Sequence, residues 1–196
     1  MNPDDSRGLG AGYSMTELSA RRFRPGSCDY WKRLTRRWRE VAEWEKRSKR
    51  VICIGSCAGG QITWLVREAA LDYRLSGDES GLSYVQDQID KLADVYYRHP
   101  ETWRERMGRT HPYWSEMHVC LAADMCRAGL DAEHRELLNR LVREHFVKAP
   151  YIGWDSGHRY LGGHNMAATE QVCAGICALV WGEEAGCAEG EAVVRR

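Results

Sequence analysis

Apolar residues recur every three or four positions along much of the chain, which is the spacing of amphipathic helices. In residues 29–49 the apolar side chains share one helical face, and arginines and lysines occupy the other. The apolar set consists of Trp31, Leu34, Trp38, Val41 and Ala42. This pattern predicts a first amphipathic helix over residues 29–49.

Five later segments have the same helical spacing of apolar residues, and short turn-forming sequences separate them. They are residues 61–75, 81–99, 113–128, 131–148 and 164–182. The sequence SGDES at 76–80 combines glycine with acids, as tight turns and new helix starts do, and Asp131 after Gly129 is a predicted N-cap. Six helices in successive antiparallel pairs predict an all-α fold of stacked helical hairpins.

One stretch, VICIGSCAGG at 51–60, is strand-like, but it is too short and too isolated to build a sheet. Within it, Cys57 between Gly55 and Gly59 is similar to the Gly-x-nucleophile-x-Gly elbow of strand-to-helix turns. A cysteine-dependent hydrolase built on such an elbow needs a central sheet around it. That alternative therefore fits poorly with the helical pattern of the rest of the chain.

The length of 196 residues, with 43% apolar and 29% charged residues, is typical of one soluble globular domain. We expect a flexible N-terminal segment at 1–28, a helical domain at 29–185 and a C-terminal tail at 186–196. Residues 1–28 lack the apolar core of a signal peptide, and no run approaches the roughly 20 apolar residues of a membrane span. The sequence thus favours a cytoplasmic protein with no membrane partner.

The 28 basic and 28 acidic residues cancel, so the chain has no overall field that would gather nucleic acid. The local exception is residues 32–50, which hold nine basic and three acidic side chains. A basic helix with tryptophans can bind a membrane surface, a calmodulin-like partner or RNA. A packed helix with a solvated charged face is the more ordinary interpretation, and we expect no nucleic-acid partner.

The eight cysteines lie in a chain that is too long and too poor in cysteine for a disulfide scaffold, which favours reduced thiols. Two pairs have a spacing of four and could together hold a zinc ion. These pairs are Cys53 with Cys57 and Cys173 with Cys177. Cysteines on buried helix faces are more commonly small apolar fillers, so no metal and no other cofactor is expected.

The densest group of aromatic and polar side chains is YIGWDSGHRYLGGHN, residues 151–165, directly before the last predicted helix. Flat aromatic rings pack on sugar faces and arginine pairs with carboxylates, so this segment is a candidate sugar-binding loop. Its candidate residues are Tyr151, Trp154, His158, Arg159, Tyr160, His164 and Asn165. The plainer interpretation is that His164 and Asn165 only cap the helix.

The order of features from Trp114 to Trp181 resembles the heparinase II/III-like and alginate-lyase families of α/α toroids. The matching pieces are YWSEM at a helix start, the hairpin CLAADMCRAGLDAEHRELLNRLVREHF, the pair YI at 151–152 and the segment GGHNMAATEQVCAGICALVWGEE. The resemblance implies part of an α/α toroid and a polysaccharide lyase that cleaves uronic-acid-containing glycans by β-elimination without a metal. An acidic polysaccharide or oligosaccharide would be its partner.

In those lyases an asparagine and a histidine neutralise the uronate carboxylate, while a tyrosine and another histidine move protons. Neutralisation is needed because the hydrogen at C5 is removable only when the charge spreading onto the carboxylate meets positioned donors. The resemblance places the first role on Asn165 and His164, and it leaves Tyr160 and His158 as the nearest acid/base groups. The substrate-binding residues that it implies are Trp154, Arg159, Tyr151, Trp114 and His111.

The chain departs from the family pattern in two places. Gly162 and Gly163 stand where relatives often carry a further asparagine before the histidine. In the family the proton-abstracting tyrosine lies further along than the Asn/His loop, so either Tyr160 or Tyr151 takes over its role here or the chain is a portion of a longer enzyme. Since three hairpins close only about half of such a ring, we interpret the chain as a portion of a longer enzyme.

Some polar residues near helix ends have ordinary structural interpretations. Tyr113 and Glu116 join His111 and Trp114 at the start of the fourth predicted helix, where capping and packing suffice. His99, His134 and His145 lie among charged residues near other helix ends. For them we expect solvated positions or interactions with the helix dipole.

Two rivals to a lyase remain open. A non-catalytic helical module could use the same surface to bind a glycan or a protein. A toroid glycoside hydrolase would need a pair of carboxylic acids, and Asp155 is the only carboxylate within residues 151–169.

Overall fold

A computed structural model describes residues 27–48, 57–98, 113–147 and 165–187, and these residues contain helices and no strand. The elements are α2 (Ser27–Ser48), α3 (Cys57–Ser76), α4 (Glu79–Ala93), η2 (Asp94–Arg98), α6 (Tyr113–Met125), α7 (Ala132–Leu141), η3 (Val142–Phe146) and α9 (Asn165–Trp181). The two η elements are single π-helical segments that continue α4 and α7. The prediction of an all-α fold is confirmed for this part of the chain.

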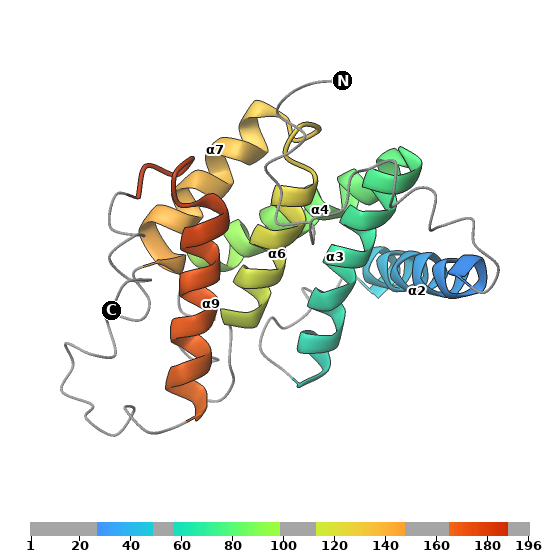
Figure 1. Ribbon diagram of the computed structural model, residues 1–196, viewed down its shortest axis with the longest axis horizontal. Helices are drawn as coiled ribbons and strands as arrows, with labels where there is room; N and C mark the ends of the chain where they lie inside the picture. The colour runs from blue at the N-terminus through green and yellow to red at the C-terminus, as the bar shows by residue number, and fades with distance from the viewer. Residues whose placement is uncertain (1–26, 49–56, 99–112, 148–164, 188–196) are drawn as a thin grey trace.

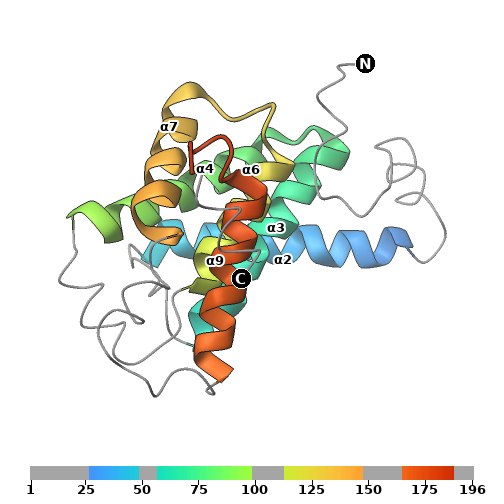
Figure 2. The same cartoon turned by 60° about the vertical axis from the view of Figure 1, so that its left-hand side comes forward.

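Apart from α2, which packs across α3, the helices form two layers, as Figure 1 shows. In the first layer α3, α6 and α9 lie side by side and run in the same direction, with α6 in the middle (Figure 1). In the second layer α4 and α7 contact each other and return in the opposite direction (Figure 2). Solenoids and α/α toroids share this arrangement of hairpins.

Short turns with identifiable chemistry join the two layers. Gly77 has a φ of +74°, a conformation that glycine adopts without strain, and its N–H donates to the carbonyl of Tyr73 at 2.7 Å. The Asp78 side chain then accepts from the Ser80 N–H at 3.0 Å and caps α4. Asp131 caps α7 in the same way through the His134 N–H at 2.9 Å. The predicted turn at 76–80 and the predicted N-cap at Asp131 are both confirmed.

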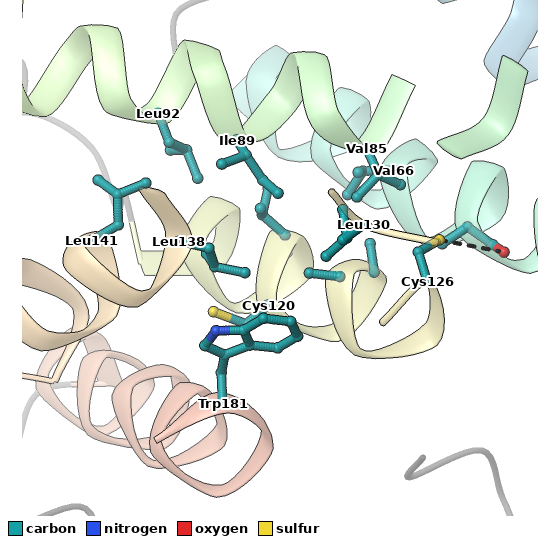
Figure 3. Packing of buried hydrophobic residues seen from close by; sticks show 14 of the residues in the cluster. Val66, Val85, Ile89, Leu92, Cys120, Cys126, Leu130, Leu138, Leu141 and Trp181 are labelled. Carbon is teal, nitrogen blue, oxygen red and sulfur yellow. Dashed lines mark hydrogen bonds between the residues drawn. The ribbon is translucent and has the colours of Figure 1, made fainter. Parts of the chain in front are cut away.

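The central helix α6 is buried along most of its length. Its buried residues with described side chains are Ser115, Glu116, His118, Val119, Cys120, Ala122, Ala123 and Asp124. The small side chains among them let α3 and α9 approach closely on both sides. Figure 3 shows the larger apolar residues of the other helices gathering around α6, including Val66, Ile89, Leu138 and Trp181. α6 is therefore the axis of the core.

Arg127, in the turn after α6, fixes the far ends of α6 and α9 against each other. Its guanidinium donates to the carbonyl of Val180 at 2.7 Å, pairs with Glu184 and lies 4.4 Å from the centre of the Trp181 ring. The indole N–H of Trp181 donates to Asn139 Oδ1 at 2.8 Å. These directional contacts set the position of α9 along α6, which apolar packing alone would leave free to slide.

Two buried carboxylates attach α2 to the rest of the molecule. Asp72 of α3 accepts from the indole of Trp38 at 3.3 Å and from Arg39 at 2.6 Å. The second carboxylate, Glu45, belongs to α2 itself. It is 6% exposed and accepts hydrogen bonds from three side chains of α4. Its donors are the Tyr84 hydroxyl at 3.2 Å, Gln88 Nε2 at 3.3 Å and Lys91 Nζ at 2.5 Å.

The outer face of α2 carries the excess of basic side chains that the sequence shows. Trp38 and Ala42 are buried, while Lys32, Arg33, Arg36 and Arg37 are exposed. An open depression on this face is lined by Thr35, Arg36, Arg39, Glu40, Glu43 and Arg47. This distribution agrees with a packed helix that has a solvated charged face. None of the described helices is long and apolar enough to cross a membrane.

The strand-like interpretation of 51–60 is wrong for its second half. Residues 57–60 form the first turn of α3 instead of extending a strand. The helical spacing of the apolar residues that follow, Ile62 and Leu65, extends back to Ala58. Glycine is tolerated within a first turn. Residues 51–56, which would form the strand before the elbow, lie outside the described residues. Cys57 itself is the first residue of α3.

Replacing Glu45 with alanine should lower the free energy of unfolding by about 3 kcal/mol, because three buried or half-buried donors lose their acceptor. The matched control is Glu43→Ala on the same helix. Glu43 is 63% exposed and, among the described residues, its side chain pairs with Lys46 at 3.5 Å, so its loss should change stability by less than about 0.5 kcal/mol. Urea denaturation followed by tryptophan fluorescence measures both. Equal effects of the two substitutions would show that Glu45 does not hold α2.

Candidate functional site

The predicted site residues fall at one end of the first layer or outside the described residues. His111, Tyr151, Trp154, His158, Arg159, Tyr160 and His164 lie outside the described residues. Trp114 is the second residue of α6 and Asn165 is the first residue of α9, and only their backbones are described. Because α6 and α9 are parallel neighbours, their first turns lie at the same end of the molecule. We call this the helix-start end.

Both π-helical segments also reach the helix-start end, because they terminate the antiparallel helices α4 and α7. In η3 the N–H of Val147 donates to the carbonyl of Val142 at 3.2 Å, the five-residue spacing of a π-helix. The segments place aromatic side chains against each other. The His145 ring stacks on Tyr96 at 4.4 Å and meets Tyr97 edge-on at 5.3 Å. Single π-helical turns of this kind are frequent at functional sites.

Glu116, in the first turn of α6, is the most strongly perturbed carboxyl group at this end. It is 1% exposed, and its Oε1 accepts from the Tyr96 hydroxyl at 2.6 Å. Its Oε2 has no hydrogen-bond partner among the described residues. Burial raises the pKa of Glu116 to about 8, although the Tyr96 bond acts in the opposite direction. Glu116 is therefore a neutral acid at pH 7 and can donate a proton or a hydrogen bond.

Tyr97 and Arg140 form the more open side of the helix-start end. The Tyr97 hydroxyl donates to Glu144 Oε2 at 3.0 Å, and the Arg140 guanidinium lies 4.6 Å from the ring centre. Burial, followed by the hydrogen bond to Glu144 and its charge, raises the pKa of Tyr97 to about 12. Tyr97 therefore stays protonated at neutral pH and cannot serve as a base, whereas Arg140 offers a cation beside an aromatic face.

The opposite face of α6 meets a second set of polar groups on α3. His118 is 3% exposed, and burial together with the charge of Arg67 lowers its pKa to about 3. Burial also lowers the pKa of Arg67 and raises that of Glu68. Arg67 Nε and Glu68 Oε2 have no hydrogen-bond partner among the described residues. His118 is thus a neutral imidazole in the α3–α6 interface, two residues along α6 from a neutral carboxylic acid.

The cysteines between α6 and α9 act as small buried side chains. Cys120, Cys173 and Cys177 are each no more than 2% exposed and are not joined in disulfides. Burial, with Cys120 and Glu116 nearby, raises the pKa of Cys177. Within the described ranges no group of three or more potential ligands could hold a metal ion. Cys53 lies outside these ranges and the side chain of Cys57 is not described, so the proposed four-cysteine site is not tested as a whole.

Sequence reasoning missed the roles of two residues at the helix-start end. His145 lies in the last turn of η3, which agrees with the expected interaction with the helix dipole, but the sequence did not indicate that its ring stacks on Tyr96 from a neighbouring element. Glu116 was assigned to packing, which is confirmed, but its neutral state was not foreseen. A glutamate on the apolar side of a helix with only one other described acid, Asp124, is the signal that could have indicated it. His134 departs from the expectation, since its side chain is only 18% exposed and it lies in the first turn of α7, where it pairs with Asp131 at 2.8 Å.

A comparison with known proteins finds no family model, no curated protein and no solved structure that matches this chain. The lyase resemblance therefore rests on the residues quoted from the sequence alone.

Replacing Glu116 with glutamine should remove part of the pH dependence of stability. The folded-state pKa of Glu116 lies above its unfolded value, so its contribution is full below pH 4.5 and is lost as pH rises towards about 8. Between pH 6.5 and 8 the free energy of unfolding of the wild type should fall by about 2 kcal/mol, and that of Glu116→Gln should not show this fall. His118 contributes in the opposite sense, because its lowered pKa removes stability as pH falls from 6.5 towards about 3.

Urea denaturation at half-unit pH steps measures this difference. Glu133→Gln, at the exposed start of α7, is the matched control and should keep the wild-type pH profile. Parallel profiles for the wild type and Glu116→Gln would contradict a neutral Glu116 in the folded state.

The buried thiols should resist alkylation in the native protein. Burial raises the pKa of Cys126 to about 12 and also raises that of Cys177, and the reactive species is the thiolate. Brief iodoacetamide treatment at pH 8, read by peptide mass spectrometry, should modify Cys187 before the other four cysteines whose side chains the structure describes, since only its side chain among the five is partly exposed. Cys126 and Cys177 should react only after denaturant is added. Early modification of either one in the native protein would contradict this order.

Proposed function

We propose that the helix-start end binds an acidic glycan and that the protein is a polysaccharide lyase-like enzyme acting by β-elimination at a uronic-acid residue. The observation that carries this proposal is the parallel packing of α6 and α9. It brings the backbone of Trp114 and that of Asn165 to one end of the layer, as a shared substrate site requires. His164 directly precedes α9 in the sequence, so both proposed carboxylate-binding residues belong to the same helix start.

The proposed chemistry divides into charge stabilisation and proton transfer. Asn165 and His164 neutralise the uronate carboxylate, which lets negative charge spread from C5 as the proton leaves. Tyr160 and His158 remove that proton and protonate the departing glycosidic oxygen. The substrate-binding residues predicted from the sequence hold the sugar rings: Tyr151, Trp154, Arg159, Trp114 and His111.

Two described residues, Glu116 and Arg140, support an anionic substrate at this end. Glu116 is neutral at pH 7, so its buried side chain places no negative charge there that would repel a uronate. Through its hydrogen bond Glu116 holds the hydroxyl of Tyr96, and it thereby acts as a positioning residue. Arg140 adds a partly exposed cation over Tyr97, where it also pairs with Glu144 at 3.8 Å and so offsets the charge of that carboxylate. Since Tyr97 has a raised pKa, the base of the reaction falls to Tyr160 or His158.

The test is incubation with a panel of polyuronates and sulfated uronic-acid glycans while near-ultraviolet absorbance follows the unsaturated product. An active substrate should lose at least about 100-fold in turnover with Asn165→Ala, because a donor to developing charge is removed. The control is Glu133→Ala at the start of α7, at the opposite end of the layers, which should keep full turnover. Circular dichroism verifies that both variants remain helical.

Each other result has a defined meaning. Saturable binding without an unsaturated product identifies a non-catalytic glycan-binding module. Reducing ends released without unsaturation identify a glycoside hydrolase. No binding to any member of the panel, or unchanged turnover in Asn165→Ala, overturns the proposed role of the helix-start end.

A further inference from the structure

The two opposite faces of helix α9 differ in solvent exposure. At 3.6 residues per turn, Cys173, Cys177 and Trp181 fall on the side that packs against the core, and all three are buried. The opposite side carries Val172 and Leu179, two turns apart, which are 59% and 63% exposed. Gly175 and Ile176 lie between them and are partly exposed. We call Val172, Gly175, Ile176 and Leu179 the α9 outer face.

The α9 outer face is unusual for an exposed surface. The 17 residues of α9 contain a single charged residue, Glu170, and a helix that is apolar on both faces is normally buried on both. Among the described residues the exposed large hydrophobic side chains are Trp44, Val172 and Leu179, so two of the three lie on this face. Figure 1 places α9 at the end of the row formed by α3, α6 and α9.

We infer that the α9 outer face pairs with the same face of a second copy of this chain, with the two α9 helices antiparallel. The face suits a two-fold axis, because Val172 and Leu179 stand symmetrically on either side of Gly175 and Ile176. In an antiparallel pair, Val172 of one copy meets Leu179 of the other. Gly175 lies near the axis, and a Cβ added there would meet no atom within 4 Å, so the backbone is open to close approach.

Charge favours pairing of the α9 outer face with the same face of a second copy over contact with the charged faces of α2 or α7. The outer face of α2 exposes Lys32, Arg33, Arg36 and Arg37, which would lose water against an uncharged helix. The exposed side of α7 carries Glu133, Glu136 and Arg140 and has the same cost. An uncharged stripe is complementary to itself, and the formal net charge of zero gives two copies no overall repulsion.

The size of the face sets the strength of the pairing. The 17 residues of α9 span about 25 Å, and one pair of helices buries less than the roughly 800 Å² per partner of a standard interface. The dimer should therefore be concentration-dependent, with a dissociation constant in the micromolar range.

Analytical ultracentrifugation of the full chain over a range of concentrations tests this pairing. The wild type should shift from monomer to dimer, while Val172→Lys with Leu179→Lys, and separately Val172→Glu with Leu179→Glu, should weaken dimerisation at least 100-fold (about 2.7 kcal/mol). Mixing the lysine and glutamate double variants should restore a dimer, because antiparallel pairing sets each lysine against a glutamate. Both substituted positions are more than half exposed, so helicity by circular dichroism should be unchanged.

Two single variants complete the design. Trp44→Lys replaces an exposed large hydrophobic residue on α2 and should dimerise like the wild type. Gly175→Ala should raise helicity through its better helix propensity and yet weaken the dimer, which separates association from folding. A wild type that stays monomeric overturns the inference. So does a mixture of the two double variants that fails to pair, since the face would then meet a different surface.

Discussion

The packing of α6 between α3 and α9 is the constraint on which the rest of the molecule depends. A helix in that position is buried on two opposite sides, so its contact residues must be small or apolar, and Cys120, Ala122 and Ala123 meet this demand. The second layer follows from it, because each hairpin turn returns the chain behind the helix that it has just left. The polar groups of Arg127 then fix the far ends of α6 and α9, where the packing of small side chains has little directional preference.

Burying α6 so deeply also fixes the protonation of its polar residues. Glu116 and His118 lie two positions apart and face different neighbours, and both are held in their neutral forms. Neutral groups of opposite type bury at lower cost than charges, but they make stability sensitive to both acid and base. Between pH 4.5 and 6.5 the proton uptake of unfolded His118 and the proton loss of unfolded Glu116 oppose each other, and the core is least sensitive to pH there.

The sequence predicted what depends on neighbouring residues and missed what depends on distant ones. The caps at Asp78 and Asp131, the glycine turn and the all-helical class follow from periodicity and turn chemistry within a few positions. The π-helical segments, the stacking of His145 on Tyr96 and the neutral state of Glu116 arise only when separate helices meet. At the candidate site, the sequence supplied residue types, and the fold adds that α6 and α9 start together. The roles of the 151–164 residues stay a prediction, because they lie outside the described part of the chain.

The parallel first layer has an electrostatic consequence. Each helix carries a partial positive charge of roughly half a unit at its first turn, and in a simple antiparallel bundle neighbouring helices would cancel it. Here α3, α6 and α9 point the same way, so these partial charges line up along one layer, and the opposing carbonyl ends belong to η2 and η3 in the other layer. Arg98 and Arg143 occupy the last turns of those two segments and offset their negative ends. One end of the molecule therefore has a polarised edge whose positive side follows the starts of α6 and α9, although the chain as a whole is neutral.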